Sequence, residues 1–217
     1  MGIICQTQAI SFFMPDAALN FEIKRKLFHL CSIVFPIIYI FTTKITMGMA
    51  LAIIAGLTLY LDISRHYNSK IKGVVDKFLG NLLRRQEQSG NFRLSGASYM
   101  ALGLFLSCLL FPRNLTITSW LVLIVADSVA SIMGMRFGTP LFNEKSYIGA
   151  VSFFVSAIFV SILSYFAIGY STSFIIIIIS SFLTTLVEFF AKQININDNL
   201  SIPITYALST VVLGLLL

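Results

Sequence analysis

Long apolar segments recur along this chain of 217 residues. A helix needs about 20 mostly apolar residues to cross the hydrocarbon core of a membrane, because each residue adds about 1.5 Å. Only 11% of the residues are charged, against about a quarter in soluble domains. Hydropathy predicts helices at residues 28–43, 45–62, 96–112, 115–134, 147–168, 173–191 and 200–217. We therefore predict an all-α fold, a polytopic transmembrane helical bundle of about seven spans.

The distribution of lysine and arginine predicts how this bundle is oriented. Basic residues are biased toward the cytosolic side of membrane proteins. With seven spans and a cytosolic N-terminus, only Lys44 and Arg113 fall on the outer side. This predicts an N-in, C-out, multi-pass integral membrane protein whose active site faces the cytosol. The net charge of +6 then belongs to the membrane surface, and we expect no nucleic-acid partner.

We expect one membrane domain, residues 1–217, with two segments outside the spans. Residues 1–21 are predicted to be a flexible N-terminal segment. Residues 64–95 form the longest polar stretch, in which apolar residues follow a helical spacing with basic residues between them. This pattern predicts an amphipathic helix on the cytosolic leaflet, and a solvated connector is the alternative. The apolar positions are Ile71, Val74, Val75, Phe78, Leu79, Leu82 and Leu83.

An aspartate within an apolar segment is the first candidate for a functional residue. Asp127 lies inside the predicted span 115–134. A charge at the centre of a spanning helix costs about 2.5–3.5 kcal/mol on insertion scales, so such residues are rare outside functional sites. The spacing i, i+4, i+7 places Asp127, Ser131 and Gly134 on one helix face. That face is polar and open to close approach.

The residues that follow resemble the start of a phosphate-binding helix. Ser146 is a candidate N-cap of the predicted helix 147–168, and Lys145 adds a positive charge beside it. Gly149 lets a ligand come near the backbone, where the first N–H groups of the helix have no intrahelical partner. Lysine and serine also begin ordinary helices at membrane surfaces, which is the structural alternative.

Further acids lie at the cytosolic ends of the last two predicted spans. Glu188 is four residues before Lys192, and these two side chains can pair with each other. Asp198 and Asn199 precede the last helix and can cap its start. Capping does not explain why these acids lie near the same predicted membrane face as Asp127.

Two other segments bring polar residues to this face. Glu22, Lys26 and His29 share one face of a predicted helix near the N-terminus. Residues 94–99 begin the third predicted span with small polar residues, among them Ser98. A site formed from helix ends, acids and cations is suited to a phosphorylated ligand bound with a metal ion.

These residues resemble the CTP-dependent lipid kinases, the family of dolichol kinase, phytol kinase and yeast-type diacylglycerol kinase, which are distantly related to phosphatidate cytidylyltransferases. The resemblance covers roughly residues 22–203, and the order and spacing of its parts are jointly specific. The chain departs from the family pattern at Ala126, Thr139 and Ala150. The matching residues are Glu22, Arg25, Lys26, His29, Ser95–Tyr99, Asp127, Ala130, Gly134, Gly138, Lys145, Ser146, Gly149, Thr185–Glu188, Asp198–Leu200 and Pro203.

The resemblance implies transfer of the γ-phosphoryl group of CTP to the hydroxyl of a membrane lipid alcohol, with Mg²⁺ or another divalent cation. The implied alcohols are a polyprenol or dolichol, phytol, and diacylglycerol, and the sequence does not select among them. The implied catalytic residues are Asp127, Lys145 and Glu188, and the implied metal ligands are Asp127 and Asp198. The implied nucleotide-binding residues are Arg25, Lys26, Gly134, Gly138, Lys145, Ser146, Gly149 and Asn199, while His29 and Ser98 would contact the lipid.

Two other functions remain as alternatives at this point. A cytidylyltransferase would join CMP to a lipid phosphate, but the chain lacks the long C-terminal motif of Lys, Asp, Gly and His residues that those enzymes carry. A transporter or membrane scaffold would need no nucleotide. Transporters often show internal repeats and polar groups near the bilayer centre, whereas here no repeat is visible and the polar groups gather at one predicted face.

Overall fold

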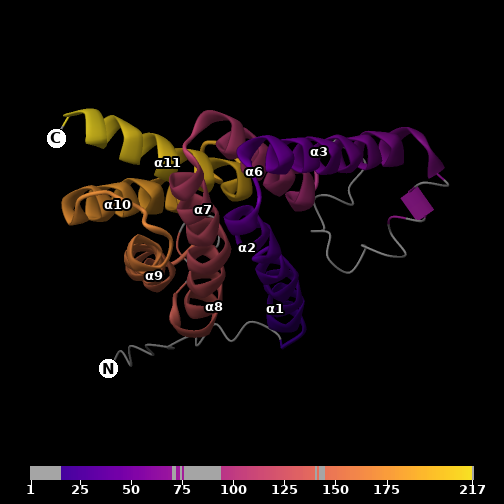
Figure 1. Ribbon diagram of the computed structural model, residues 1–217. Helices are drawn as coiled ribbons and strands as arrows, with labels where there is room; N and C mark the ends of the chain where they lie inside the picture. Colours follow the sequence, from indigo (N-terminus) through magenta and orange to yellow (C-terminus); the bar gives the residue numbers. More distant parts are fainter. Residues whose placement is uncertain are drawn as a thin grey trace, which may run out of the picture.

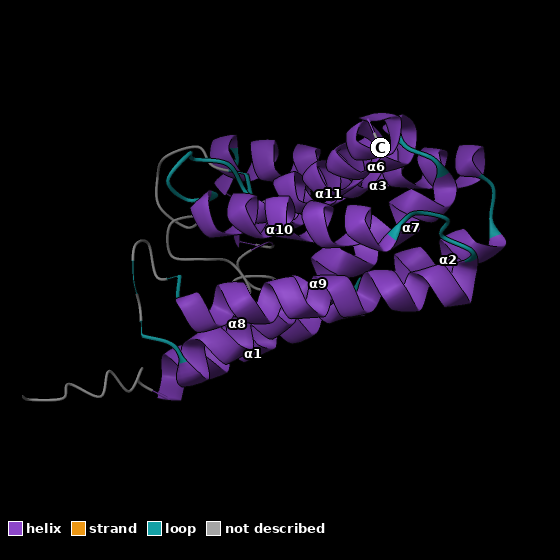
Figure 2. Ribbon diagram, turned by 90° about the vertical axis from the view of Figure 1, so that its left-hand side faces the viewer, coloured by secondary structure: helices purple, strands orange, loops and turns teal. Residues whose placement is uncertain are grey.

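The computed structural model describes residues 16–69, 72, 73, 75, 94–139, 141 and 145–216, and this part of the chain is helical with no strand. Helices α9, α10 and α11 lie side by side, next to a long central helix formed by α7, η1 and α8 (Figures 1 and 2). The helices are α1 (Asp16–Cys31), α2 (Val34–Phe41), α3 (Lys44–Tyr67), α6 (Gly96–Leu110), α7 (Arg113–Leu121), η1 (Val122–Ala126), α8 (Asp127–Phe137), α9 (Tyr147–Ile168), α10 (Phe174–Phe190) and α11 (Asp198–Leu216).

The prediction of an all-α membrane bundle is confirmed. Among the described residues, four helices are long and apolar enough to cross a membrane, and α6 and α10 are shorter apolar helices. The four long ones are Lys44–Tyr67, Arg113–Phe137, Tyr147–Ile168 and Asp198–Leu216. The seven spans and the N-in, C-out orientation stay predictions.

The first predicted span is where the helix bounds differ most. Residues 28–43 were expected to form one helix, but α1 ends at Cys31 and α2 begins at Val34. Pro36 lies in the first turn of α2, where its missing N–H leaves no intrahelical hydrogen bond unmade. Thr43 then caps α3, because its hydroxyl accepts a hydrogen bond of 3.2 Å from the N–H of Thr46. Figure 1 shows α3 leaving the line of α1 and α2 at a steep angle.

Two predicted segments fall partly outside the described residues. Helix α1 begins at Asp16, within the segment 1–21 that was expected to be flexible, and residues 1–15 are not described. Most of the predicted amphipathic connector, including Ile71, Val74, Phe78, Leu79, Leu82 and Leu83, also lies outside the described residues.

The core is centred on the long helix Arg113–Phe137. In its most apolar window 72% of the residues are buried inside the protein, against 28% in α3 and in α9. Trp120 is fully buried and stacks on Tyr39, with the ring centroids 5.2 Å apart. Helices α1, α2, α6, α9 and α11 pack against this central helix, whereas α3 packs on α6 and α10 packs on α9 and α11.

This central helix is wound more widely over one stretch. The five residues of η1 are π-helical, whereas α7 before it and α8 after it are α-helical. A π-helical turn holds one more residue than an α-helical turn, and such turns are frequent at functional sites. The first residue after this wide turn is Asp127.

Helices α6 and α11 approach each other closely at a glycine. Pro203 in α11 cannot donate to the carbonyl of Asn199 four residues earlier. A Cβ atom added to Gly103 would lie 2.5 Å from this carbonyl oxygen. Only glycine therefore allows this contact, which fixes the start of α11 against α6.

Candidate functional site

Asp127 forms a buried ion pair across two helices. Lys26 on α1 donates a hydrogen bond to its Oδ2 atom, and both side chains are 3% exposed. His29, one turn further along α1, has its Nε2 atom 3.7 Å from the same oxygen and 3.3 Å from the carbonyl oxygen of Leu123. Buried charges persist when they are paired, so α1 supplies the charge that Asp127 requires.

A second ion pair on α1 lies beside the first. Two nitrogens of Arg25 donate hydrogen bonds to the carboxylate of Glu22, and Ser131 on α8 donates to the same carboxylate at 3.3 Å. Burial lowers the pKa of Arg25, but its hydrogen bond to Glu22 and the negative charges of Glu22, Asp127 and Asp198 outweigh this effect and raise the pKa. Arg25 is therefore a permanent cation within electrostatic reach of two further acids.

A second group of charges consists of Lys145, Glu188 and Asp198. Together with the ion pairs of Asp127 and Arg25, this group forms one cluster of acids and cations. Lys145 donates a hydrogen bond to Glu188, and its Nζ atom lies 3.8 Å from Oδ2 of Asp198. Burial lowers the pKa of Lys145, but Glu188, Asp198 and Asp127 together raise it above its ordinary value of 10.5. The partner of Glu188 found here is thus Lys145 rather than the Lys192 suggested by sequence spacing. Asp198, with 13% of its side chain exposed, is more accessible than Glu188 at 4%.

Tight packing of α8 against the start of α9 positions Lys145. Ser146 caps α9, as predicted, because its hydroxyl accepts a hydrogen bond of 3.1 Å from the N–H of Gly149. A Cβ atom on Gly149 would lie 3.1 Å from the carbonyl oxygen of Ala130, and one on Gly134 would lie 3.3 Å from Cα of Gly149. The two glycines therefore face each other, and Gly138, which also contacts Ser146, belongs to the same junction.

Ser98 and Asn199 lie in a separate polar junction. The hydroxyl of Ser98 donates to Asp62 at 2.6 Å, and the N–H and hydroxyl of Ser95 donate to the same oxygen at 2.7 and 2.8 Å. Asn199 donates from its amide to the carbonyl oxygen of Gly96 at 3.0 Å. These bonds join α3, α6 and α11.

Asp62 was not among the predicted site residues, although its position in the sequence could have indicated a buried ion pair. It is an ionisable residue near the end of an apolar segment, with Arg65 one turn later. In the structure both side chains are buried, and Nε of Arg65 lies 3.2 Å from Oδ1 of Asp62. A spacing of i, i+3 between opposite charges predicts such a pair.

The donor groups are compatible with a magnesium ion that arrives with a nucleotide. Within the described ranges no group of three His, Cys, Asp or Glu side chains is close enough to hold a metal ion. Magnesium is usually held by one or two carboxylates together with substrate phosphates. Asp198 and Asp127 are the acids that can supply such carboxylates, each now near a lysine.

The fold and this cluster define a class: an all-α membrane protein with acids and cations from α1, α8, α10, α11 and the start of α9 gathered in its interior. Comparison with known proteins assigns the chain to a family. It is 50% identical to "Uncharacterized protein RP860" of Rickettsia prowazekii over 92% of this chain and 98% of that protein. It is 30% identical to "Uncharacterized protein MJ1137" of Methanocaldococcus jannaschii over 86% of this chain and 91% of that protein. The chain belongs to the family of these two proteins.

A more distant likeness connects the chain to plant enzymes. "Phytol kinase 1, chloroplastic" of Arabidopsis thaliana is 29% identical over 129 residues, which are 54% of this chain and 42% of the plant protein. "Probable phytol kinase 1, chloroplastic" of Oryza sativa is 28% identical over a similar share. No protein-family model matches the chain, and no solved structure matches it significantly. The homology to phytol kinases is therefore partial and distant.

Proposed function

We propose that this protein is a CTP-dependent kinase that phosphorylates the hydroxyl of a membrane lipid alcohol. The observation that carries the proposal is the buried cluster in which Lys145 lies between Glu188 and Asp198, next to the Lys26–Asp127 pair. Partial homology to plant phytol kinases supports the same reaction class. Each charged side chain in an apolar bundle costs free energy, and binding of a nucleotide with its metal ion would explain why these charged residues are present.

The proposed reaction breaks the bond between the γ-phosphorus of CTP and its bridging oxygen to the β-phosphorus. A new bond forms between this phosphorus and the lipid hydroxyl oxygen, and CDP leaves. The hydroxyl proton passes to a carboxylate or to solvent. Phosphoryl transfer depends mainly on positioning and on stabilising negative charge, which fixed cations and helix N-termini supply.

In this proposal Lys145 and the first amides of α9 bind the phosphates, and Arg25 adds positive charge from α1. Asp198, the more accessible acid beside Lys145, accepts the proton of the lipid hydroxyl. Lys26 and His29 hold Asp127 in place. A divalent cation, when bound with CTP, would neutralise phosphate charge, and Asp127 is the acid that would hold it.

The test uses the purified chain in lipid vesicles with γ-labelled CTP, magnesium and separate alcohols: polyprenols, phytol and diacylglycerol. We expect label to move into one alcohol class with release of CDP, and Lys145→Ala to lose this transfer. Lys24→Ala is the matched control, since Lys24 is an exposed lysine on α1. Asp198→Asn, which leaves the Lys145–Glu188 pair intact, is expected to lose transfer while it keeps the fold.

Other outcomes point to the alternatives. Release of pyrophosphate with a lipid phosphate as acceptor would replace the kinase with a cytidylyltransferase. Absence of turnover with every acceptor, in a preparation that unfolds cooperatively on heating, would refute both enzymes and favour a transporter or scaffold.

A further inference from the structure

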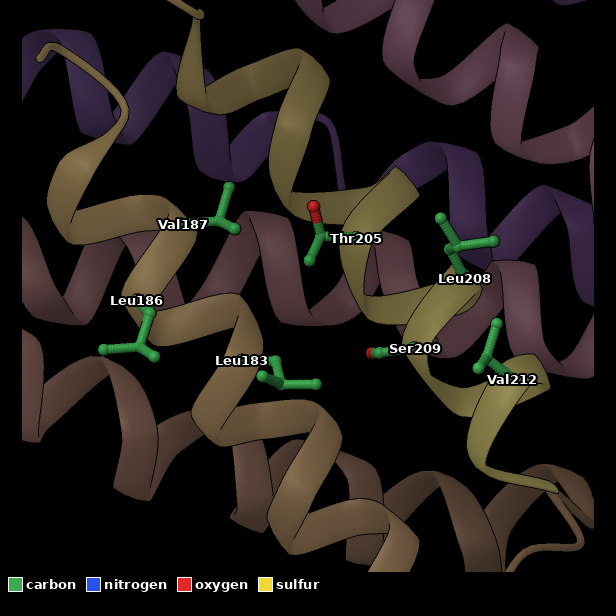
Figure 3. Close-up of a pocket in the computed structure, with 7 residues that line it drawn as sticks. All are labelled: Leu183, Leu186, Val187, Thr205, Leu208, Ser209 and Val212. Atoms are coloured by element: carbon green, nitrogen blue, oxygen red, sulfur yellow. The ribbon is translucent and has the colours of Figure 1, made fainter. Parts of the chain in front are cut away.

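A groove lies on the outer surface of the bundle between α10 and α11. Its volume is about 430 Å³, which falls within the range of about 300–1,000 Å³ that is common for small-molecule sites. Its walls are mainly aliphatic, and Leu183 and Leu208 are 38% and 51% exposed. Figure 3 shows Leu183 and Ser209 pointing toward each other across the groove. The groove therefore opens toward the hydrocarbon of the membrane.

The groove is aligned with the cluster of acids and cations. On α11, Asp198 and the groove residues Thr205, Ser209 and Val212 follow at i, i+7, i+11 and i+14, which places them on one helix face. At about 1.5 Å per residue, Thr205 lies about 10 Å along the helix from Asp198. On α10, the groove residue Val187 directly precedes Glu188. One end of the groove thus lies near Asp198 and its partner Lys145.

A hydroxyl group in the apolar wall marks this same end. Thr205 lies opposite Val187 across the groove (Figure 3), and of the groove residues these two are the nearest in sequence to Asp198 and Glu188. Its hydroxyl makes no hydrogen bond to any other residue that the structure describes. The hydroxyl of Ser209, by contrast, donates to the carbonyl oxygen of Tyr206 at 3.0 Å. Thr205 can therefore offer a donor and an acceptor to the polar end of a bound molecule.

We propose that this groove binds the linear apolar chain of the lipid alcohol and leads its hydroxyl to Asp198 and Lys145. The inference rests on the proposed kinase function and specifies how the acceptor reaches the site. A groove between two neighbouring helices is suited to an isoprenoid or acyl chain. A chain that arrives from the bilayer already lies in hydrocarbon, so the groove adds only better packing and no further removal of apolar surface from water. Selectivity therefore depends on the polar end.

The first test compares the variants Leu183→Trp, which fills the groove, and Leu163→Trp, its matched control. Leu163 lies on α9, away from the groove, and is 57% exposed. We expect Leu183→Trp to raise the KM for the lipid alcohol about tenfold or more, with the KM for CTP changed by less than about twofold. Leu163→Trp is expected to behave as the wild type.

The second test does not depend on catalysis. A lipid alcohol that carries a diazirine in its chain is photolysed with the wild-type protein in phosphatidylcholine vesicles, and the adducts are located by mass spectrometry. We expect adducts on residues 183–187 and 205–212, and we expect excess unlabelled alcohol, present during photolysis, to prevent them. Adducts that still form in the presence of excess unlabelled alcohol would mean that bulk lipid fills the groove. Adducts elsewhere would place the acceptor on another surface. Either result overturns the inference.

The two tests separate the two proposals. If the wild type phosphorylates a lipid alcohol but Leu183→Trp retains its kinetics, the groove assignment fails and the kinase stands. If no phosphorylation occurs but specific adducts form in the groove, the kinase fails and an alcohol-binding groove stands.

Discussion

The buried pair of Lys26 and Asp127 gives a prediction that separates structure from chemistry. Removing one member of a buried ion pair costs about 3–5 kcal/mol, because the other charge stays buried without its partner. Both side chains here are 3% exposed, so we expect Lys26→Met to reach this range. For a chain of this size the change corresponds to a fall in Tm of about 6–20 °C. The double variant with Lys26→Met and Asp127→Asn removes both charges and should regain most of this loss.

The measurement is thermal unfolding in lipid nanodiscs, followed by tryptophan fluorescence. The chain has one tryptophan, and Trp120 is fully buried in the core, so its emission reports loss of the packed bundle. Lys24→Met, at an exposed position of α1, is the control for loss of a positive charge. We expect the double variant to fold but to lack lipid phosphorylation. A Tm of Lys26→Met close to that of the wild type would refute the buried pair. A stable double variant with full activity would remove Asp127 from the reaction.

Three further predictions concern other parts of the bundle. Gly103→Ala places a Cβ atom 2.5 Å from the carbonyl oxygen of Asn199 and should cost about 1–3 kcal/mol in the same unfolding assay, whereas Gly56→Ala, with no atom within 4 Å, should stabilise by up to about 1 kcal/mol. Ser98→Ala removes a hydrogen bond of 2.6 Å to Asp62 and should lower stability by about 1.5–3 kcal/mol; a changed KM for the lipid with unchanged stability would instead place Ser98 at the acceptor. Burial lowers the pKa of Lys145, but nearby acids raise it above 10.5, so the stabilising charge of Lys145 is fully present below that ordinary value and is lost only as pH rises through the higher folded value. Glu188→Gln removes the strongest of these acids, so the variant should begin to lose stability at a lower alkaline pH than the wild type. Thermal melts from neutral to alkaline pH measure this difference.

The helices of this protein could be predicted from sequence because lipid leaves few choices for the backbone. Apolar length located the apolar helices from α3 to α11. The main disagreement, the break after Cys31, arises where Pro36 cannot continue the hydrogen-bond ladder. The cap at Ser146 was also predictable, since capping is local.

The pairing of charges between helices was harder to predict. Lys26 and Asp127 are 101 positions apart, and Lys145 and Glu188 are 43 apart, so no periodicity within one helix relates them. Spacing within α10 and the residues after it suggested Lys192 as the partner of Glu188, but tertiary packing brings Lys145 there instead. Ser98 and Asn199 have the residue types of a ligand site, yet their contacts are with Asp62 and Gly96, which only three-dimensional packing reveals.

The π-helical turn η1 sets the rotational phase between the two halves of the central helix. Successive residues of an α-helix are about 100° apart around its axis. If Val122–Ala126 wound as an ordinary α-helix with the same number of residues, its extra residue would turn α8 by about this angle relative to α7. Asp127 would then face away from Lys26, and Gly134 away from Gly149, while the hydropathy of the segment would be unchanged. A homologue with a one-residue gap in this turn would therefore keep both the membrane helix and the site, through an unbroken α-helix.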